Sequence, residues 1–377
     1  MRGRWSPASD LDRGRTGSVI AGRPPAWTVG AVGLAIGAAI AVRLLAVSGM
    51  DPTAFLGEGN GKPVQLRYAE RLLGDVEVRA RAGHDGKFFF AQANDPWFLD
   101  PEQNAAVLDR PLYRGQRMLY PVLAGGFGLF PPNVVVWSLI VVNVIAFGVG
   151  TFLTAEVAMR LGSSSWLGLA FALNIGLIFE LAIDGSGVVA FAFCLVGLLA
   201  LMRERLWLAA LAFMAAALAR DVMLAFAGGL FALEWFDGRR ALWKIVLLPL
   251  SGLLVWSVYL RIRLAGVSGA GGAPRVFDVP FVGVVGGIRS WLREPDDLPI
   301  DVLIFVIIVA FGIGAWRSRV PLAWGALPFV PLAALLADDV WAEPFDLSRA
   351  VAPIFTAAAF LVIANRHGRL AANQRHR

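Results

Sequence analysis

The chain has 377 residues, of which 57% are hydrophobic and only 16% are charged, and its mean hydropathy is +0.65. A soluble protein of this composition would have too few polar side chains to cover its surface, so the balance excludes a soluble globular domain and indicates an integral membrane protein. The formal net charge of +6 comes from short basic clusters between apolar runs, a pattern that favours topology signals over a nucleic-acid-binding face.

The first 133 residues divide into three parts. Residues 1–25 are rich in Arg, Gly, Pro and Ser without apolar periodicity, so we expect a disordered cytoplasmic tail. The apolar run 26–47 is longer than the core of a secretory signal peptide, which favours an uncleaved first span. Residues 48–133 mix acids and bases and contain no clear span, so they are predicted to be a long external loop.

Within this loop, the stretch GHDGKFFFAQANDPWF predicts a short amphipathic helix that begins near Asp85 and ends at Asp95-Pro96. Phe88–Phe90 are expected to dip into the lipid headgroup region. Asp85 then has two interpretations, a helix cap that contributes about 1 kcal/mol or a carboxylate held over a cavity mouth. The segment 117–130 is apolar but too short to span, so we expect it to be re-entrant or to lie on the surface.

Nine further apolar runs follow the loop and are separated by short polar turns. They predict spans at 134–158, 165–183, 186–202, 206–219, 222–236, 242–263, 301–316, 321–337 and 350–364. Ten spans in total place the short basic clusters and both termini in the cytoplasm. The predicted fold class is therefore all-α, a polytopic membrane helical bundle over residues 26–365 with a second cytoplasmic tail at 366–377.

This topology gathers the unusual polar residues on the external side of the membrane. They are Asp85, Asp95, Arg114, Arg117, Glu180, Asp184, Arg220, Asp221, Asp338, Asp339, Glu343, Asp346 and Arg349. A charged surface over short helices is where we expect a site. The single cysteine, Cys194, and the three scattered histidines give no disulfide framework, zinc site or Ser-His-Asp arrangement.

Each candidate in the later spans has a structural and a functional interpretation. Glu180 and Asp184 are four residues apart and are expected to share a helix face, either snorkelling or binding substrate. Arg220-Asp221 is either a self-paired polar turn or a cation facing an anionic substrate. Arg349 is either an interfacial anchor or a phosphate clamp, since guanidinium presents fixed donors to phosphate oxygens.

The order of these features resembles the GT-C superfamily of integral membrane glycosyltransferases, such as the polyprenyl-phosphate-mannose-dependent mannosyltransferases. The resemblance is carried by GHDGKFFFAQANDP after the first span, an RMLYP segment, short spans with an Arg-acid pair, and PFDLSRAVAP before the last span. It covers residues 27–365. Members often have two neighbouring acids in the first loop, whereas His84 precedes Asp85 here.

The resemblance implies inverting transfer of a sugar from a polyprenyl-phosphate donor to a hydroxyl of a lipid or glycan acceptor, with Asp85 as general base. Arg117, Arg220 and Arg349 would bind the leaving phosphate, and Glu180 and Asp184 would bind sugar hydroxyls or orient the arginines. Asp221 is a further candidate substrate-binding residue. Asp95 is the candidate for a second acid. No metal ligand set is assigned, although a divalent cation is compatible with the reaction, and no nucleic acid partner is expected.

Two other functions remain open at this point. A multi-pass transporter or flippase for a lipid-linked or anionic substrate would also carry buried acids and arginines, but near the bilayer midplane. A non-catalytic scaffold is the third interpretation. The excess of arginine over lysine and the abundant alanine suggest a GC-rich bacterial genome, and hence a bacterial plasma membrane.

Overall fold

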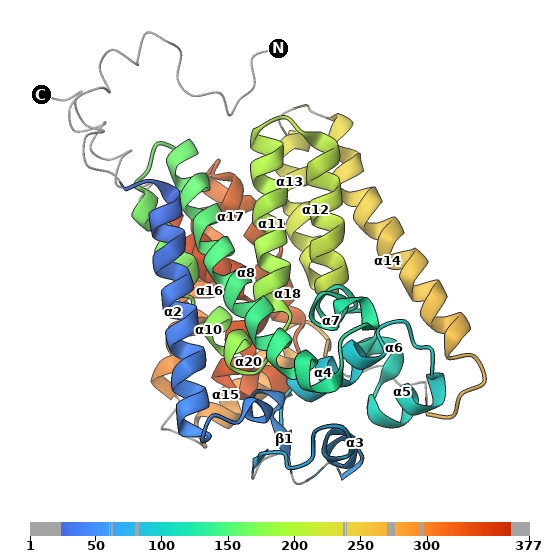
Figure 1. The fold of residues 1–377 in the computed structure, drawn as a ribbon. Coiled ribbons are helices and arrows are strands. Elements are labelled where there is room, and N and C mark those ends of the chain that lie inside the picture. The colour runs from blue at the N-terminus through green and yellow to red at the C-terminus, as the bar shows by residue number, and fades with distance from the viewer. Residues whose placement is uncertain are drawn as a thin grey trace, which may run out of the picture.

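The computed structural model describes residues 24–59, 61, 63–79, 83–236, 238, 240–269, 276–293 and 298–362. Most of these residues form helices that run side by side between two ends of the molecule (Figure 1). Four helices are long and apolar enough to cross a membrane, or six if each of two bent helix pairs counts as one span. The predicted tail at 366–377, and all but the last two residues of the tail at 1–25, lie outside the described residues.

The first span, α2 (Ala26–Val47), packs along α8 (Pro132–Arg160). Glycines let the two helices approach closely, because a Cβ at Gly33 would lie 2.3 Å from the Oγ1 of Thr151. Small residues at such contacts are the usual way for helices to pack within lipid, where apolar burial alone gives little driving force. A helix at 26–47 that is long and apolar enough to cross a membrane is confirmed.

Two apolar helix pairs are bent, and they contact each other at their bends. The first consists of η3 (Ser165–Gly168), α9 (Leu169–Ala172) and α10 (Ile175–Ala182), with a bend of 51° before α10. The second bends by 71° between α20 (Pro344–Ala350) and a helix at 352–362. At the first break, the side-chain amide of Asn174 donates to the carbonyl of Ala352 at 2.7 Å. This contact ties the two breaks together and sets α10 beside α20.

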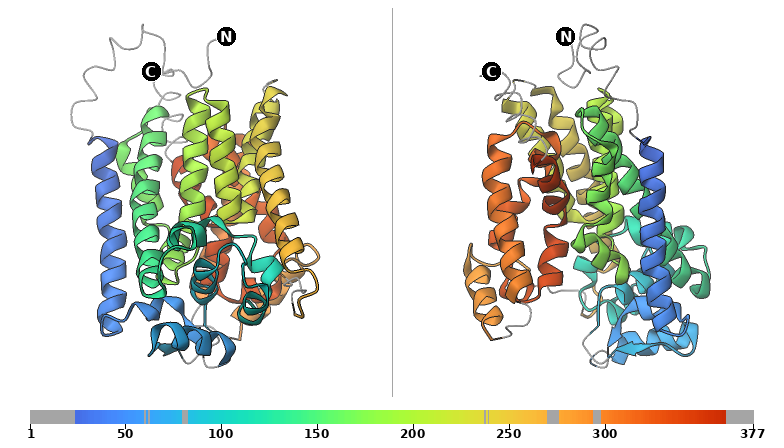
Figure 2. Two further views of the ribbon diagram at one scale, coloured as in Figure 1. Left: turned by 45° about the vertical axis from the view of Figure 1, so that its right-hand side comes forward. Right: turned by 90° about the vertical axis from the view of Figure 1, so that its left-hand side faces the viewer.

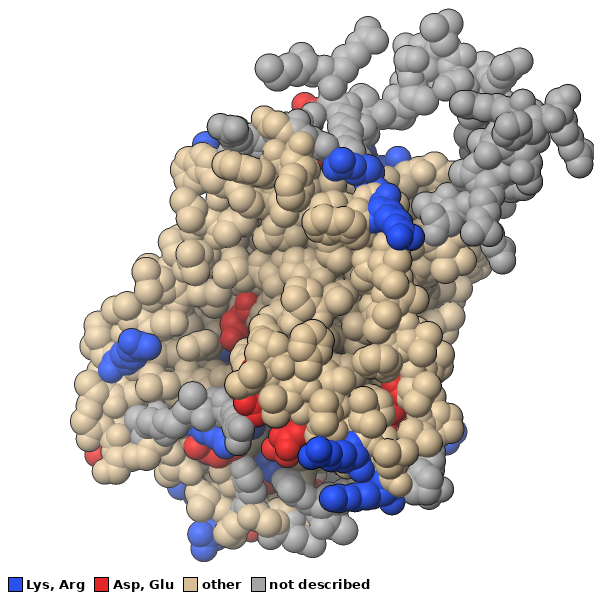
Figure 3. Space-filling view, turned by 180° about the vertical axis from the view of Figure 1, so that it is seen from behind, with Lys and Arg blue, Asp and Glu red and all other residues tan. Residues whose placement is uncertain are grey.

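The other helices complete the bundle. They are α11 (Gly187–Met202), α12 (Leu206–Ala219), η4 (Asp221–Met223), α13 (Leu224–Phe236), η5 (Arg240–Trp243), α14 (Lys244–Arg263), α15 (Val282–Trp291), α16 (Leu298–Arg317), α17 (Pro321–Ala326), α18 (Phe329–Leu335) and α19 (Asp338–Ala342). On the face in Figure 3, uncharged residues make up most of the middle of the molecule, and most charged side chains lie toward its two ends. This distribution suits a protein whose middle is surrounded by hydrocarbon.

The segment between α2 and α8 forms a layer of short elements at one end of the bundle (Figures 1 and 2). They are η1 (Pro52–Leu56), β1 (Glu58–Gly59), α3 (Pro63–Leu73), β2 (Val78–Arg79), α4 (Gly86–Asn94), α5 (Pro101–Val107), α6 (Pro111–Arg114), α7 (Leu119–Ala124) and η2 (Gly126–Gly128). The two strands are a minimal parallel pair in which Glu58 aligns with Val78.

The predicted helix after Asp85 is present as α4, but its phenylalanines do not reach lipid. Phe88, Phe89 and Phe90 are at most 4% exposed and lie in the main core. The Phe89 ring meets Tyr120 edge-on, and Phe90 meets Tyr68 in the same way. The expectation that this run enters the headgroup region was wrong, because neighbouring elements of the same layer bury it.

Candidate active site

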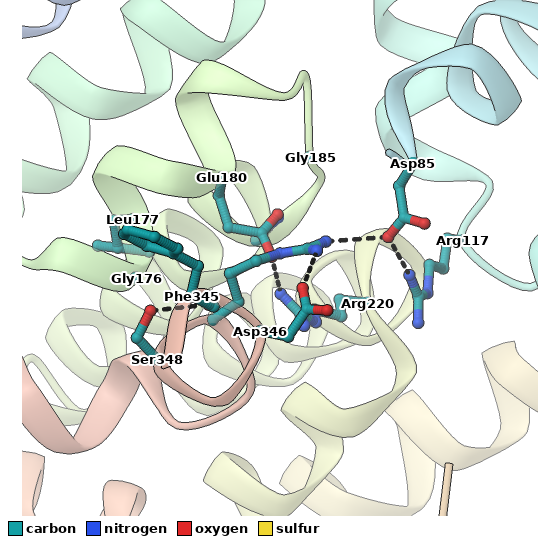
Figure 4. A network of polar contacts seen from close by, with 12 residues as sticks. Asp85, Arg117, Gly176, Leu177, Glu180, Gly185, Arg220, Phe345, Asp346 and Ser348 are labelled. Carbon is teal, nitrogen blue, oxygen red and sulfur yellow. Dashed lines mark hydrogen bonds and ion pairs between the residues drawn. The ribbon is translucent and has the colours of Figure 1, made fainter. Parts of the chain in front are cut away.

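Asp85 precedes α4 at the N-cap position, but its side chain makes no capping hydrogen bond. Its carboxylate turns instead toward three guanidinium groups. Oδ1 accepts from Nη1 of Arg114 at 2.6 Å, and Oδ2 accepts from Nη2 of Arg349 at 2.9 Å. Nη1 of Arg117 lies 3.8 Å from Oδ2 (Figure 4). The interpretation of Asp85 as a helix cap is therefore wrong.

The charge state of Asp85 follows from this environment. Burial alone would raise the pKa of the Asp85 carboxyl, but the cations of Arg114, Arg349 and Arg117 outweigh it and hold that pKa well below its usual range. Asp85 is therefore a carboxylate at neutral pH. It is able to accept a proton only weakly while all three arginines stay in place.

Arg349 joins the two acids of the site. It lies on α20 and uses all three guanidinium nitrogens, one for each of three carboxylates. Nε donates to Glu180, Nη2 to Asp85 and Nη1 to Asp346, each at 2.9 Å. A planar fork of fixed donors can hold several carboxylates in one plane in this way, which a lysine cannot do.

Glu180 is 1% exposed and lies near the end of α10. Besides the bond from Arg349, the Glu180 carboxylate accepts hydrogen bonds from Nη1 of Arg220 at 2.5 Å and from the backbone N–H of Gly187 at 2.9 Å. A Cβ at Gly187 would lie 2.7 Å from both the Arg220 guanidinium and the Glu180 carboxyl carbon, so a larger residue there would displace this ion pair. Figure 4 shows Glu180 and Arg220 on one side of this network and Asp85 and Arg117 on the other.

Arg117 is the least satisfied cation of the site. One of its terminal nitrogens donates to the Tyr113 hydroxyl, and the other is the 3.8 Å neighbour of Asp85. Its Nε is buried and has no hydrogen-bond partner among the residues that the structure describes. A buried, unpaired charged donor is costly, so this side chain has binding capacity for a further anion.

A cavity of about 260 Å³ opens beside Arg117 and Arg220. Tyr113 and Asp221 also line it, and the remaining wall is apolar. The apolar lining comprises Val222, Val276, Phe277, Phe329, Leu332, Ala333, Leu336, Ala350 and Val351. The cavity therefore offers two arginines, with Tyr113 and Asp221 beside them, and an otherwise apolar wall, which suits a ligand with an anionic head and an apolar tail.

The structure brings most of the predicted site residues together. Asp85, Arg117, Glu180, Arg220 and Arg349 form one contact network, and Asp221 lines the adjoining cavity. The interpretation of Arg220-Asp221 as a self-paired turn was wrong, because the Arg220 guanidinium reaches Glu180 instead. Arg349 is likewise no interfacial anchor, since it is only 8% exposed and engaged by three acids.

Two predicted residues stand apart from this network. Asp184 lies beyond the end of α10 with a φ of 49° and is fully buried, so it does not share a helix face with Glu180. Asp95 is the C-cap residue of α4, and its carboxylate accepts the N–H groups of Leu99 and Asp100 and the amide of Asn104. Asp95 therefore has a local structural role, and neither residue lines the cavity beside Arg117.

Sequence reasoning did not assign Arg114 to the site. Its guanidinium pairs with Asp85 and with Asp109, the latter at 3.1 Å, and lies 4.1 Å from the centroid of the Phe88 ring. The available signal was the spacing of Arg114 and Arg117, which puts two arginines within one turn of each other. The Phe88 ring packs beneath the cation, so part of the phenylalanine run supports the site.

The donor set does not suit a divalent metal ion. Among the described residues, no group of three or more His, Cys, Asp or Glu side chains could hold one. A cation bound to Asp85 would also lie beside three guanidinium groups. The positive charges in this site come from arginine.

No protein-family model, curated protein or solved structure matches the chain.

Proposed function

We propose that the chain is an integral membrane glycosyltransferase of the GT-C type. It moves a sugar from a polyprenyl-phosphate donor to a hydroxyl of a lipid or glycan acceptor, with inversion at the anomeric carbon. The observation that carries the proposal is the Asp85 carboxylate held by arginines, one of which, Arg117, also lines an adjoining cavity together with Arg220 and a largely apolar wall. That combination suits a lipid-anchored phosphate whose bond to a sugar is to be broken.

The chemistry assigns one task to each charge. Asp85 accepts the proton of the acceptor hydroxyl while its oxygen forms a bond to the anomeric carbon. The bond from that carbon to the phosphate oxygen breaks, and its electron pair stays on the phosphate. Arg117 and Arg220 line the cavity and stabilise the growing negative charge, as fixed donors in other enzymes do by about 2.7–4 kcal/mol each.

Binding of the donor makes Asp85 a stronger base, because the donor phosphate competes with Asp85 for its arginine partners. In the free enzyme, Arg117 and Arg349 both act on the Asp85 carboxylate. A donor phosphate competes for these cations, and each interaction that it takes over raises the pKa of Asp85 toward its usual range. The base is thereby strengthened in the complex, where proton transfer is needed.

The same proposal includes the topology. Ten passes result when the four long helices, the two bent pairs, the three shorter apolar helices and α13 are all counted as spans, and we place both termini in the cytoplasm and the 48–133 loop outside. The compartment would be a bacterial plasma membrane. The charged network then faces the outside, at the end of the bundle that carries α4, α6 and α15 (Figure 1). A transporter would need its charges near the midplane, so this placement favours the enzyme.

Transfer by the purified protein tests the proposal. The full chain in nanodiscs is given a panel of labelled polyprenyl-phosphate sugars, with lipid and glycan acceptors, beside Asp85→Asn. Glu102→Gln is the matched control, an exposed acid of the same layer on α5. We expect transfer from one donor by wild type and the control, and transfer at least about a hundredfold slower by Asp85→Asn. Donor uptake across the bilayer without transfer would instead support the transporter.

A further inference from the structure

A second cavity lies between α15 and α19 and shares no lining residue with the site of Asp85. It has a volume of about 360 Å³. Its lining consists of Gly286, Arg289, Ser290 and Arg293 from α15 and the residues after it, and Asp338, Asp339 and Ala342 from α19. One wall thus carries two arginines and the other carries two aspartates.

These opposite charges face one cavity without pairing. Among the described residues, neither Arg289 nor Arg293 makes a side-chain ion pair or hydrogen bond, and the same is true of Asp338 and Asp339. The two walls are also fixed in place, since the indole of Trp291 donates to a backbone carbonyl of α19 at 2.6 Å. A rigid cavity with separated charges of both signs fits a zwitterion.

The neighbouring face of α15 is apolar and open. Val282, Val285, Ile288 and Leu292 recur at helical spacing and are between 39% and 69% exposed. Arg289 and Arg293 lie along one edge of this stripe, and a helix that exposes apolar and basic side chains side by side suits the plane of the membrane surface. Figure 2 shows α15 outside the main bundle at the end that carries α3 and α4, where a membrane surface would pass.

We propose that this cavity binds the headgroup of phosphatidylethanolamine. The lipid phosphate lies between Arg289 and Arg293, and the primary ammonium donates to Asp338 and Asp339. The acyl chains then run along the apolar stripe of α15. Phosphatidylglycerol offers no ammonium to the aspartates, and the methylated ammonium of phosphatidylcholine has no N–H to donate, so both bind more weakly.

Native mass spectrometry of the full-length protein in detergent tests this site. The delipidated protein is titrated with phosphatidylethanolamine, phosphatidylcholine or phosphatidylglycerol. We expect wild type to bind phosphatidylethanolamine about tenfold more tightly than the other two, since charge-assisted hydrogen bonds are lost with each. Equal binding of the three lipids would overturn the proposal, because it would show only unspecific lipid contact.

Two double variants separate the two halves of the headgroup. Arg289→Gln/Arg293→Gln should lose about tenfold in binding of phosphatidylethanolamine, since its phosphate loses both cations. Asp338→Asn/Asp339→Asn should keep phosphate binding and lose the preference over phosphatidylglycerol. Arg261→Gln, an exposed arginine in the last turn of α14, is the matched control and should bind as wild type. A preference that survives both double variants would contradict the assignment.

Discussion

An aspartate lies at each end of α4, and the two carboxylates differ in how far along the chain their partners lie. Asp95 at the C-terminal end satisfies its carboxylate locally, with two backbone N–H groups and the Asn104 amide within nine residues. Asp85 at the N-terminal end makes no capping bond and is held by arginines that lie 29, 32 and 264 residues away. Local bonds stabilise a turn, whereas distant cations assemble a site.

This contrast shows which acid is available for chemistry. The oxygens of Asp95 are occupied by bonds that the fold requires. The oxygens of Asp85 are occupied by side chains, and one of these, Arg117, also lines a cavity and has a nitrogen without a hydrogen-bond partner among the described residues. A ligand can therefore compete for the partners of Asp85 but not for those of Asp95.

The largest expected effect on transfer comes from neutralising Asp85 at the N-terminal end of α4. Asp85→Asn keeps the shape and removes the base, so transfer should fall about 10²–10⁴-fold, the usual contribution of a positioned general base. The measurement is the turnover of labelled donor in nanodiscs. A loss of transfer rate of less than tenfold would show that another residue is the base. Asp85 would then be a structural residue, as Asp95 is.

Breaking the bridge between the acids should cost stability as well as activity. Arg349→Gln leaves buried Glu180 with one arginine and removes a partner of Asp85, so unfolding should be easier by about 3–5 kcal/mol. Thermal unfolding in detergent measures this loss. Arg261→Gln serves as the exposed arginine control, and an equal melting temperature in the two variants would contradict the bridging role of Arg349.

Replacing Arg117 should weaken donor binding more than it destabilises the fold. Arg117→Gln removes a cation whose Nε has no hydrogen-bond partner among the described residues, so its loss should raise the donor KM about tenfold. Donor titrations give KM and kcat separately. A melting point lowered as far as in Arg349→Gln, with KM unchanged, would show that Arg117 is structural.

At the other end of α4, the effect should appear in stability only. Asp95→Asn weakens hydrogen bonds to Leu99, Asp100 and Asn104, so we expect a loss of about 1–3 kcal/mol in unfolding free energy and little change in kcat. Thermal unfolding and turnover are measured on the same preparation. A hundredfold loss of kcat in a folded Asp95→Asn protein would transfer the catalytic role to this acid.

The pH dependence should separate the free enzyme from its complex. The pKa of Asp85 is lowered on folding, so its ion pairs stabilise the protein above the unfolded pKa of about 3.9 and are lost as the pH falls through the folded value. The profile of kcat/KM should therefore show no acid limb down to pH 5. The profile of kcat should show a limb at higher pH, because phosphate takes over the arginines. Identical acid limbs in the profiles of kcat/KM and kcat would contradict the proposal that the donor phosphate takes over the arginine partners of Asp85.

Hydropathy predicted the fold well where the signal is local. The predicted spans 26–47, 206–219 and 242–263 differ from α2, α12 and α14 by two residues at most. The breaks at Asn174 and Val351 were not predicted, because the bend depends on contacts between segments 178 residues apart. Those breaks bring Glu180 to Arg349, so the least predictable part of the fold builds the site.

The site itself was predicted by residue type and topology, not by geometry. Placing charges on one side of the membrane grouped Asp85 with Arg349 although 264 residues separate them. The helical spacing of Glu180 and Asp184 misled, because α10 ends at Ala182 and the chain turns at Asp184. The position of Phe88–Phe90 was also predicted wrongly, because an apolar sequence does not show whether lipid or other parts of the protein cover its side chains.

The most direct test of the account measures donor binding and single-turnover transfer on the same Asp85→Asn sample. The account predicts that the variant binds the polyprenyl-phosphate donor at least as tightly as wild type, since the arginines lose a competing carboxylate, yet transfers at least about a hundredfold more slowly. Transfer at the wild-type rate from a fully bound donor would contradict it.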